Sequence, residues 1–359
     1  MKGKTKLFAI LLVLALLTAI AAGCGQPTTS APPSEEVTGF RGTPDQSYYM
    51  IQFVTGVEYW FPVYAMFKHA AMQLGVQAHY VETIEYDAQR QLDVFEQILA
   101  MNPTGILFCP INPDIFVEPI NRAIAQGVAI VTYATDSPDS NRHAFITSDN
   151  VFEGQFAARK LAEEIGYSGK LMTLCNPGQL NHDIRVEVFI KTIEDEFPNI
   201  ELVANLPSNQ DVEVAYTHVM TVAQMHPDLA GVFMPEANSG MGAARASQEL
   251  GGKIRVLCTD VNDAILDMIK AGQIWGAINP DQGMQGYWGM LLTFVSANPQ
   301  LIEPMNHRKA FGENPLFIPF MDNGLNIVTA ETADYYYIDN YLKVLGVGSV
   351  DELLSSYIP

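Results

Sequence analysis

Cys24 is the residue whose chemical role can be predicted most directly, because of the segment that precedes it. Lys2, Lys4 and Lys6 form a positive start, and an apolar run with Thr18 as its one polar residue follows from residue 7 to residue 22. This run of about 16 residues is shorter than the ~20 that a membrane-spanning helix requires. A positive start, a short apolar core and small residues before the cysteine are typical of a secretory signal, predicted here as residues 1–23.

The thiol of Cys24 stands where a bacterial lipoprotein carries its lipid. The small residues Ala21, Ala22 and Gly23 lead directly into Cys24, and this arrangement resembles the lipobox, although Ala21 stands where leucine is more common. Lipidation would make Cys24 the mature N-terminus and tether the chain to the outer face of the cell membrane. A plain signal peptide with an incidental cysteine is the alternative reading. Either way, the sequence predicts an extracytoplasmic protein.

Constellations that would support catalysis or metal binding are missing from the sequence. It contains no G-x-S-x-G elbow and no P-loop, and Gly240 and Gly242 give only a fragment of a dinucleotide-binding motif. The histidines are scattered, with no pair at metal-binding helical spacing. We therefore expect no enzyme activity, no cofactor and no metal, although a pair of acids in a cleft could imitate a glycosidase.

The charge of the chain excludes several classes of partner. The formal net charge is −20, and removal of the signal would take away three lysines and bring it to −23. A protein that binds nucleic acid or an anionic membrane surface does so through clusters of Lys and Arg. We therefore expect neither as a partner of this acidic chain. Cys109, Cys175 and Cys258 each end a short apolar run and are predicted to be buried free thiols.

Short β-rich runs alternate with helical stretches along most of the chain. After a Pro- and Ser-rich linker at 24–46, strands are predicted near 48–54, 77–83, 105–109, 129–133 and 144–148, with Asp87 capping one of the helices between them. The alternation restarts at Asn150, which has capping-box spacing to Glu153. Such alternation predicts α/β architecture with parallel sheets covered on both faces.

The halves of this pattern predict two doubly wound parallel-sheet lobes joined by a hinge that the chain crosses several times. We assign 47–148 plus about 281–315 to the N-terminal lobe and 149–280 plus about 316–359 to the C-terminal lobe, with a last strand pair near 315–328. In open α/β sheets ligands bind beyond the carboxyl ends of the strands, so a cleft between the lobes is the expected site.

From about residue 48 to residue 329 the chain resembles the type I periplasmic sugar-binding proteins, the ribose-binding-like substrate-binding components of ABC importers. The segments that carry this resemblance are EYWFPVYAMFKHAAMQLGV, IVTYATDSPDSNRHAFITSDN, NHDIRVEVF, VFMPEANSGMGAARA and VLCTDVNDAILDMIKAGQIWGAINPDQ. The resemblance implies the periplasmic binding protein type I fold. It also implies that a monomeric protein captures a small sugar or polyol and delivers it to a membrane permease with its ATPase.

The resemblance also implies which residues face the ligand. Aromatic faces suit sugar rings, and carboxylates, amides and an arginine fork suit hydroxyl groups. The residues at matching positions are Tyr59, Trp60, Thr135, Asp136, Arg185, Gln210, Glu236, Asn238, Asp260 and Asn279. Several have a structural alternative: Tyr59 and Trp60 as core of the first helix, Arg185 as an exposed helical residue, and Asp260, Glu236 or Asn238 as helix caps.

One position departs from the family pattern. An aspartate commonly follows the fourth strand, and here that place is taken by Ala134, followed by Thr135 and Asp136. Either Asp136 substitutes from a shifted loop, or the ligand lacks the hydroxyl pair that the aspartate grips. The sequence also leaves open a sensory receptor that signals to a histidine kinase or chemoreceptor and transports nothing.

Overall fold

The computed structural model describes residues 39–53, 56–302 and 318–356. The predicted signal peptide, Cys24 and most of the predicted linker lie outside these residues. Within the described ranges, none of the helices combines the length and the apolar character needed to cross a membrane.

The first sheet has the strand order β11-β5-β4-β3-β1-β2, and its neighbouring strands run parallel. Its strands are β1 (Ser47–Ile51), β2 (Gln77–Val81), β3 (Gly105–Phe108), β4 (Ala129–Tyr133), β5 (Ala144–Thr147) and β11 (Phe320–Asp322). The helices that accompany it are α2 (Trp60–Leu74), α3 (Ala88–Ala100), α4 (Val117–Ala125) and α10 (Gln282–Ala297). Buried side chains of α2 and α10 form one core cluster and those of α3 and α4 another, so both faces of this sheet are covered.

The second sheet has the order β12-β10-β9-β8-β6-β7, in which only the β12–β10 pair is antiparallel among the described strands. Its strands are β6 (Gly169–Cys175), β7 (Ile200–Pro207), β8 (Leu229–Met234), β9 (Arg255–Thr259), β10 (Gly276–Asn279) and β12 (Asn326–Val328). Its helices are α5 (Asn150–Glu164), α6 (Leu180–Glu196), α7 (Val212–Met225), α8 (Ala237–Glu249) and α9 (Asp263–Lys270). Two core clusters again cover the two faces.

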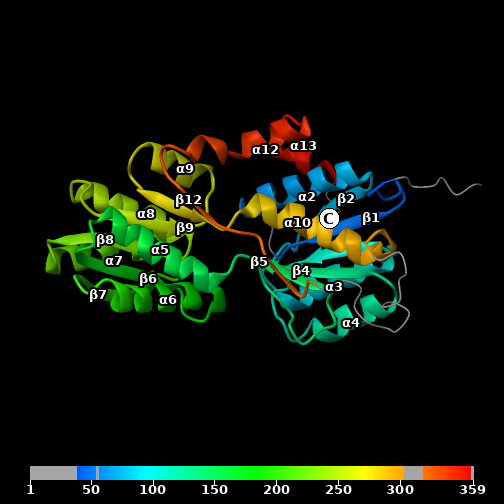
Figure 1. The fold of residues 1–359 in the computed structure, drawn as a ribbon, viewed down its shortest axis with the longest axis horizontal. Coiled ribbons are helices and arrows are strands. Elements are labelled where there is room, and N and C mark those ends of the chain that lie inside the picture. Colours follow the sequence, from blue (N-terminus) through cyan, green and yellow to red (C-terminus); the bar gives the residue numbers. More distant parts are fainter. Residues whose placement is uncertain (1–38, 54–55, 303–317, 357–359) are drawn as a thin grey trace, which may run out of the picture. The chain divides into compact units, whose positions relative to one another are not determined.

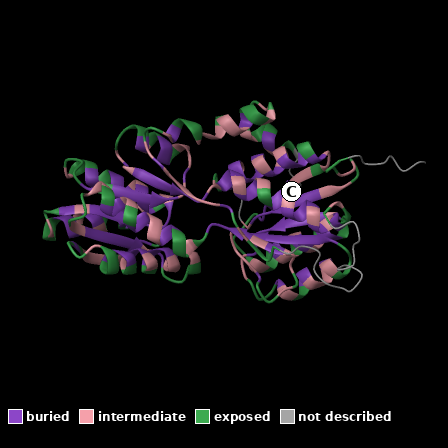
Figure 2. Cartoon of the chain, viewed as in Figure 1, coloured by how far each residue is buried: buried purple, intermediate pink, exposed green. Residues whose placement is uncertain are grey.

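These two sheets confirm the predicted fold class of two doubly wound α/β lobes (Figure 1). In the described chain, four segments lead from one lobe to the other: between β5 and α5, between β10 and α10, between β11 and β12, and after β12 toward the C-terminal helices. Strands of both sheets carry mainly buried residues (Figure 2), as expected where helices pack on both faces.

The starts of two helices test the capping predictions. Asp87 caps α3, because its side chain accepts a hydrogen bond from the Arg90 amide at 2.8 Å, as predicted. The predicted capping box of Asn150 and Glu153 is wrong. Asp149 caps α5 instead, accepting from the amides of Val151 and Phe152.

The C-terminal part of the chain differs from the predicted lobe boundary. We assigned residues 316–359 to the second lobe, but β11 pairs with β5 of the first sheet, so β11 and β12 do not pair with each other. The helices α12 (Ile338–Leu345) and α13 (Val350–Leu353) follow. Leu342 and Leu353 are buried in the core cluster of α2, and Lys68 Nζ donates to the Leu353 carbonyl at 3.1 Å. The chain therefore returns to the first lobe because that lobe offers the apolar surface of α2.

Candidate functional site

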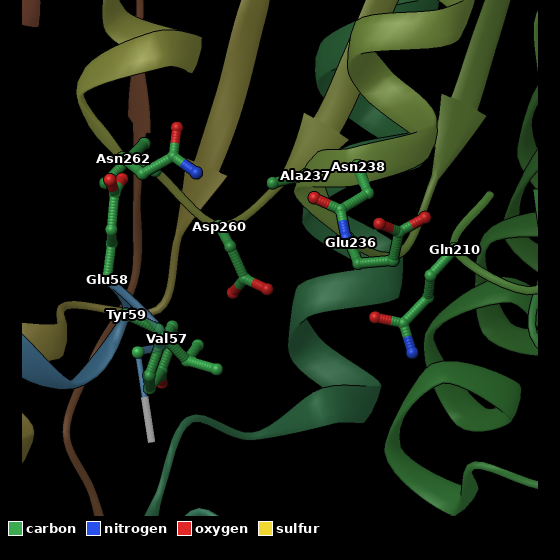
Figure 3. Close-up of a pocket in the computed structure, with 11 residues that line it drawn as sticks. Val57, Glu58, Tyr59, Gln210, Glu236, Ala237, Asn238, Asp260 and Asn262 are labelled. Carbon is green, nitrogen blue, oxygen red and sulfur yellow. The ribbon is translucent and has the colours of Figure 1, made fainter. Parts of the chain in front are cut away.

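A cavity of about 440 Å³ lies where loops after the strands of the second sheet meet the start of α2. The residues that line it are Gly56, Val57, Glu58, Tyr59, Gln210, Glu236, Ala237, Asn238, Asp260, Val261 and Asn262. Figure 3 shows the side chain of Asp260 between Glu58 and Tyr59 on one side and Glu236 and Asn238 on the other. The structure thus brings together five of the predicted site residues: Tyr59, Gln210, Glu236, Asn238 and Asp260.

Asp260 follows β9 directly and turns the chain toward the cavity. Its backbone adopts a left-handed conformation with φ +67°, and its amide donates to the Ile278 carbonyl at 2.8 Å. It does not cap α9, because Asn262 does so by accepting from the Ile265 amide at 2.9 Å. Burial, reinforced by Glu153 and Glu236 and opposed by Arg185, raises the pKa of Asp260 to about 7.

Glu236 follows β8 and forms part of the cavity wall while capping α8. Its two carboxylate oxygens accept from the Ser239 amide at 3.2 and 3.1 Å, and the residue is only 3% exposed. Burial raises the pKa of this carboxyl group, although the hydrogen bonds from Ser239 oppose the change. The two roles that the sequence left open, helix cap and cavity residue, are therefore both filled by Glu236.

Gln210 and Tyr59 reach the cavity from opposite lobes. Gln210 has φ +62°, and its backbone N–H donates to Asn176 Oδ1 at 2.9 Å, which fixes the loop before α7. Tyr59 precedes α2, and its hydroxyl donates to Gln285 Oε1 of α10 at 3.3 Å. Burial raises the pKa of the Tyr59 hydroxyl well above its usual value, with Asp260 adding to the effect, so it remains a neutral hydroxyl.

Arg185 does not line the cavity, although the sequence placed it there. It is 5% exposed and forms an ion pair with Glu153, Nε to Oε2 3.0 Å. Nε also donates to Asn150 Oδ1 at 3.0 Å, and Nη1 donates to the Pro235 carbonyl at 3.1 Å. Because Pro235 immediately precedes Glu236, Arg185 stands behind the cavity wall and supports it.

Trp60 is a core residue in this structure, which is the alternative that the sequence left open. It is 4% exposed and meets Phe53, Tyr59 and Tyr133 edge-to-face, with ring centroids 5.3, 4.7 and 5.7 Å apart. Its indole Nε1 has no hydrogen-bond partner among the described residues. Trp60 is not among the residues that line the cavity.

Thr135 and Asp136 form their hydrogen bonds with neighbouring residues of the first lobe and not with the cavity. The Thr135 hydroxyl donates to the Pro110 carbonyl at 2.6 Å. Asp136 is paired with Arg142 and accepts from the Thr132 hydroxyl at 2.6 Å. Neither residue lines the cavity, and the carboxylate of Asp136 already has a full set of partners.

Asn279 lies at the end of β10, beside Asp260, but outside the lining of the cavity. It is 1% exposed, and its Oδ1 has no hydrogen-bond partner among the described residues. A buried amide without a partner is unusual, since more than nine in ten buried polar groups are paired. Asn279 is therefore available to a polar group that comes close to this strand edge.

The cavity also contains residues that sequence reasoning missed. Glu58 and Asn262 carry polar side chains into the lining, and Val57 and Val261 supply apolar surface. Their signal in the sequence was proximity alone, because Glu58 precedes Tyr59 and Asn262 follows Asp260 by two positions. Within the described ranges there is no group of three His, Cys, Asp or Glu that could hold a metal ion.

What the arrangement can do chemically follows from these side chains. Carboxylates and amides are strong acceptors for hydroxyl hydrogens, and a carboxylate acceptor roughly doubles the strength of a neutral hydrogen bond. The cavity combines such groups with the ring of Tyr59 and two valines, so it can hold a small ligand with many hydroxyl groups and some apolar surface.

Known proteins resemble this chain over most of its length. The D-allose-binding periplasmic protein of Escherichia coli (strain K12) is 25% identical over 269 residues, which are 70% of this chain and 85% of that protein. The structure of AraP, an arabinose binding protein from Geobacillus stearothermophilus, matches with a TM-score of 0.75 and 30% identity, covering 82% of this chain and 100% of that one.

A second solved structure gives a similar result. The sugar ABC transporter (sugar-binding protein) from Bacillus halodurans matches with a TM-score of 0.74 and 33% identity, covering 81% of this chain and 100% of that one. The model of a periplasmic binding protein domain matches residues 48–296, which span both sheets. The chain therefore belongs to the periplasmic binding protein family, in agreement with the resemblance read from its sequence.

Proposed function

We propose that this protein is an extracytoplasmic sugar-binding protein that captures a small sugar or polyol and delivers it to the permease of an ABC importer. The observation that carries the proposal is the cavity itself. Glu236 and Asp260 follow two neighbouring strands of the second sheet, and Tyr59 faces them from the first lobe.

The chemistry of the cavity supports an uncharged, hydroxyl-rich ligand. The carboxylates of Asp260 and Glu236 accept hydrogen bonds from ligand hydroxyl groups, and the amides of Gln210 and Asn238 both donate and accept. A volume of about 440 Å³ is within the range of small-molecule sites. The names of the relatives, which bind allose and arabinose, favour a monosaccharide.

The remaining parts of the proposal concern the protein's place in the cell. The signal segment and Cys24 favour a lipid anchor on the outer face of the cell membrane, and the ATPase of the importer is a partner of the permease rather than of this chain. The protein acts as a monomer, without a cofactor and without a catalytic reaction. Ligand binding draws together the lobes formed mainly by 47–148 and 149–280.

A panel of pentoses, hexoses and polyols tests the function. One member should raise the melting temperature and bind with one ligand per chain by calorimetry, since a ligand at 100 times its Kd stabilises the folded state by about 2.7 kcal/mol. The absence of binding across the panel would contradict the proposal. Deletion of the gene should also abolish uptake of that labelled sugar. Binding without any effect on uptake would instead indicate a sensory receptor.

A further inference from the structure

All ionisable acid and base side chains among the described residues that line the cavity are acids. Glu58, Glu236 and Asp260 contribute carboxylates, and no lysine, arginine or histidine belongs to the residues that line it. The other polar side chains, apart from the Tyr59 hydroxyl, are the neutral amides of Gln210, Asn238 and Asn262. A ligand that enters this cavity at pH 7 therefore meets acceptors and negative charge, of which Asp260, with a pKa of about 7, carries only a part, and no cation at the wall.

Glu236 is the acid whose position is most strongly fixed. Both of its oxygens accept from the Ser239 amide at the first turn of α8, and the helix dipole at that end favours a negative charge. The Ser239 hydroxyl donates in turn to Ser208 Oγ at 2.8 Å. The carboxylate of Glu236 is thus held in place by the fold and cannot turn away from an unsuitable ligand.

Arg185 stands behind the cavity wall and favours the charged form of Asp260, but its own hydrogen-bonding groups are already engaged. Arg185 is 5% exposed, and its guanidinium is committed to Glu153, Asn150 and the Pro235 carbonyl. His182 neighbours it, and burial together with Arg185 lowers the pKa of this imidazole to about 3, so the ring is neutral at pH 7. Neither residue offers an available positive charge to a ligand.

An observation that does not involve the acids also points to a ligand that donates hydrogen bonds. The amide of Asn279 is buried at the strand edge beside Asp260, and its Oδ1 has no partner among the described residues. An amide oxygen of this kind is satisfied by a hydroxyl or an N–H donor, and not by a carboxylate. Asn279 lies outside the lining but ends β10, the strand next to β9, so it offers this acceptor to a donor that reaches past Asp260.

We propose that this cavity selects uncharged or positively charged sugars, amino sugars included, and rejects sugar acids, with Glu236 as the residue that sets this selectivity. The inference rests on the proposed sugar-binding function and adds the charge class of the ligand to it. A sugar carboxylate would be brought close to fixed carboxylates in a partly dehydrated space, where repulsion is stronger than in water.

Calorimetry at pH 7 with matched sugars tests the selectivity. One set is D-galactose, D-galactosamine and D-galacturonic acid, and the other is D-glucose, D-glucosamine and D-glucuronic acid, with L-arabinose and D-xylose as the pentoses of the same ring stereochemistry. In the wild type the uronic acid should bind at least fivefold more weakly than its neutral counterpart, and the amino sugar at least as well. A smaller difference between uronic acid and neutral sugar overturns the inference.

Glu236→Gln keeps an oxygen that can accept from the Ser239 amide, so the cap on α8 is retained. It should reduce the ratio of neutral-sugar to uronic-acid affinity at least threefold, and Asp260→Asn provides a second variant at the same cavity. The matched control is Glu201→Gln, on the exposed side of β7, which should leave the ratio unchanged.

An unchanged ratio in Glu236→Gln also overturns the inference, whatever the result with Asp260→Asn. If no pentose, hexose or polyol of the wider panel binds, the proposed sugar-binding function fails and the inference fails with it. If a sugar outside the two sets is the one that binds, that sugar and its own uronic acid form the test pair. A uronic acid that binds as well as its neutral sugar contradicts the inference alone.

Discussion

Arg185 and Glu153 form an ion pair with 3.0 Å between Nε and Oε2, and their side chains are only 7% and 0% exposed. Glu153 also accepts a hydrogen bond from the Ser148 hydroxyl at 3.2 Å. The pair therefore connects the end of β5, where the chain leaves the first sheet, with the loop that carries Glu236. Its position makes Arg185 a supporting residue of the cavity wall.

Removal of one partner of this pair should strongly destabilise the protein. Glu153→Ala leaves the guanidinium buried without a counter-charge, and the free energy of unfolding should fall by about 3–5 kcal/mol in urea titrations. The double variant Glu153→Leu, Arg185→Met should recover most of this loss, because both charges are then absent. A loss below about 1 kcal/mol in the single variant would show that water reaches Arg185.

Asp260 should make the stability of the ligand-free protein decrease as the pH rises. Its pKa is about 7 in the fold against 3.8 in its ordinary state. Between about pH 4 and pH 7 the folded protein holds a proton that the unfolded chain has lost, so the free energy of unfolding falls across this window. Asp260→Asn has no titrating group at this position, and asparagine tolerates the left-handed backbone conformation. Its stability advantage over the wild type should grow from pH 4.5 to pH 7.5, and an advantage that stays constant would contradict the assignment.

His182 should act in the opposite direction. Its ring is buried and its Nδ1 lies 3.1 Å from Asn176 Nδ2, and its pKa is lowered from 6.5 to about 3. As the pH falls below 6.5 the unfolded chain binds a proton that the fold excludes, so stability is lost toward acid pH. The urea midpoint should drop less between pH 7 and pH 4.5 in His182→Gln than in the wild type. Equal drops in both proteins would show that His182 is protonated in the fold.

Trp60 should be required for stability and not for ligand affinity. Trp60→Ala removes a buried aromatic ring and should cost about 3–5 kcal/mol in urea unfolding. Trp60→Phe should cost less, because Nε1 has no hydrogen bond to lose. The sugar affinity of Trp60→Phe should stay within threefold of the wild type by calorimetry. A stable Trp60→Phe variant that no longer binds would place the indole against the ligand.

Cys24 should carry the lipid anchor. Labelling of growing cells with a fatty-acid analogue should mark the wild-type protein and leave Cys24→Ala unmarked, since the thiol is the attachment point. Cys175→Ala is a matched control that removes a different, partly exposed thiol. Equal labelling of the wild type and Cys24→Ala would contradict the anchor.

Most of the architecture could be predicted from hydrophobic periodicity. The alternation of buried strands and amphipathic helices fixes two parallel sheets, and the Asp87 cap follows from its spacing. The last strands could not be placed, because β11 and β12 have three residues each and their partners, β5 and β10, are distant in sequence. Short edge strands carry too little pattern to identify the sheet to which they belong.

Sequence reasoning predicted the site residues that directly follow a strand. It did not predict the side-chain contacts that residues make with distant helices. Asp260 and Glu236 end buried runs, and the sheet geometry alone brings them to one edge. Glu153 has the spacing of a capping box with Asn150, but Arg185 of α6 contacts both side chains instead. The spacing between neighbouring residues gives no information on Arg185, which lies 32 and 35 positions after Glu153 and Asn150.

The return of the C-terminal segment to α2 has a consequence for the order in which the lobes are completed. The first lobe needs α10, β11, Leu342 and Leu353 from the far end of the chain, whereas the second lobe, apart from β12 and the segment with Ala333 that follows it, is continuous from Asn150 to Asn279. Domains generally fold as units when their residues become available. The lobe that is synthesised first is therefore the one that finishes last, and the part of α2 that packs against Leu342 and Leu353 stays uncovered until the last helices arrive.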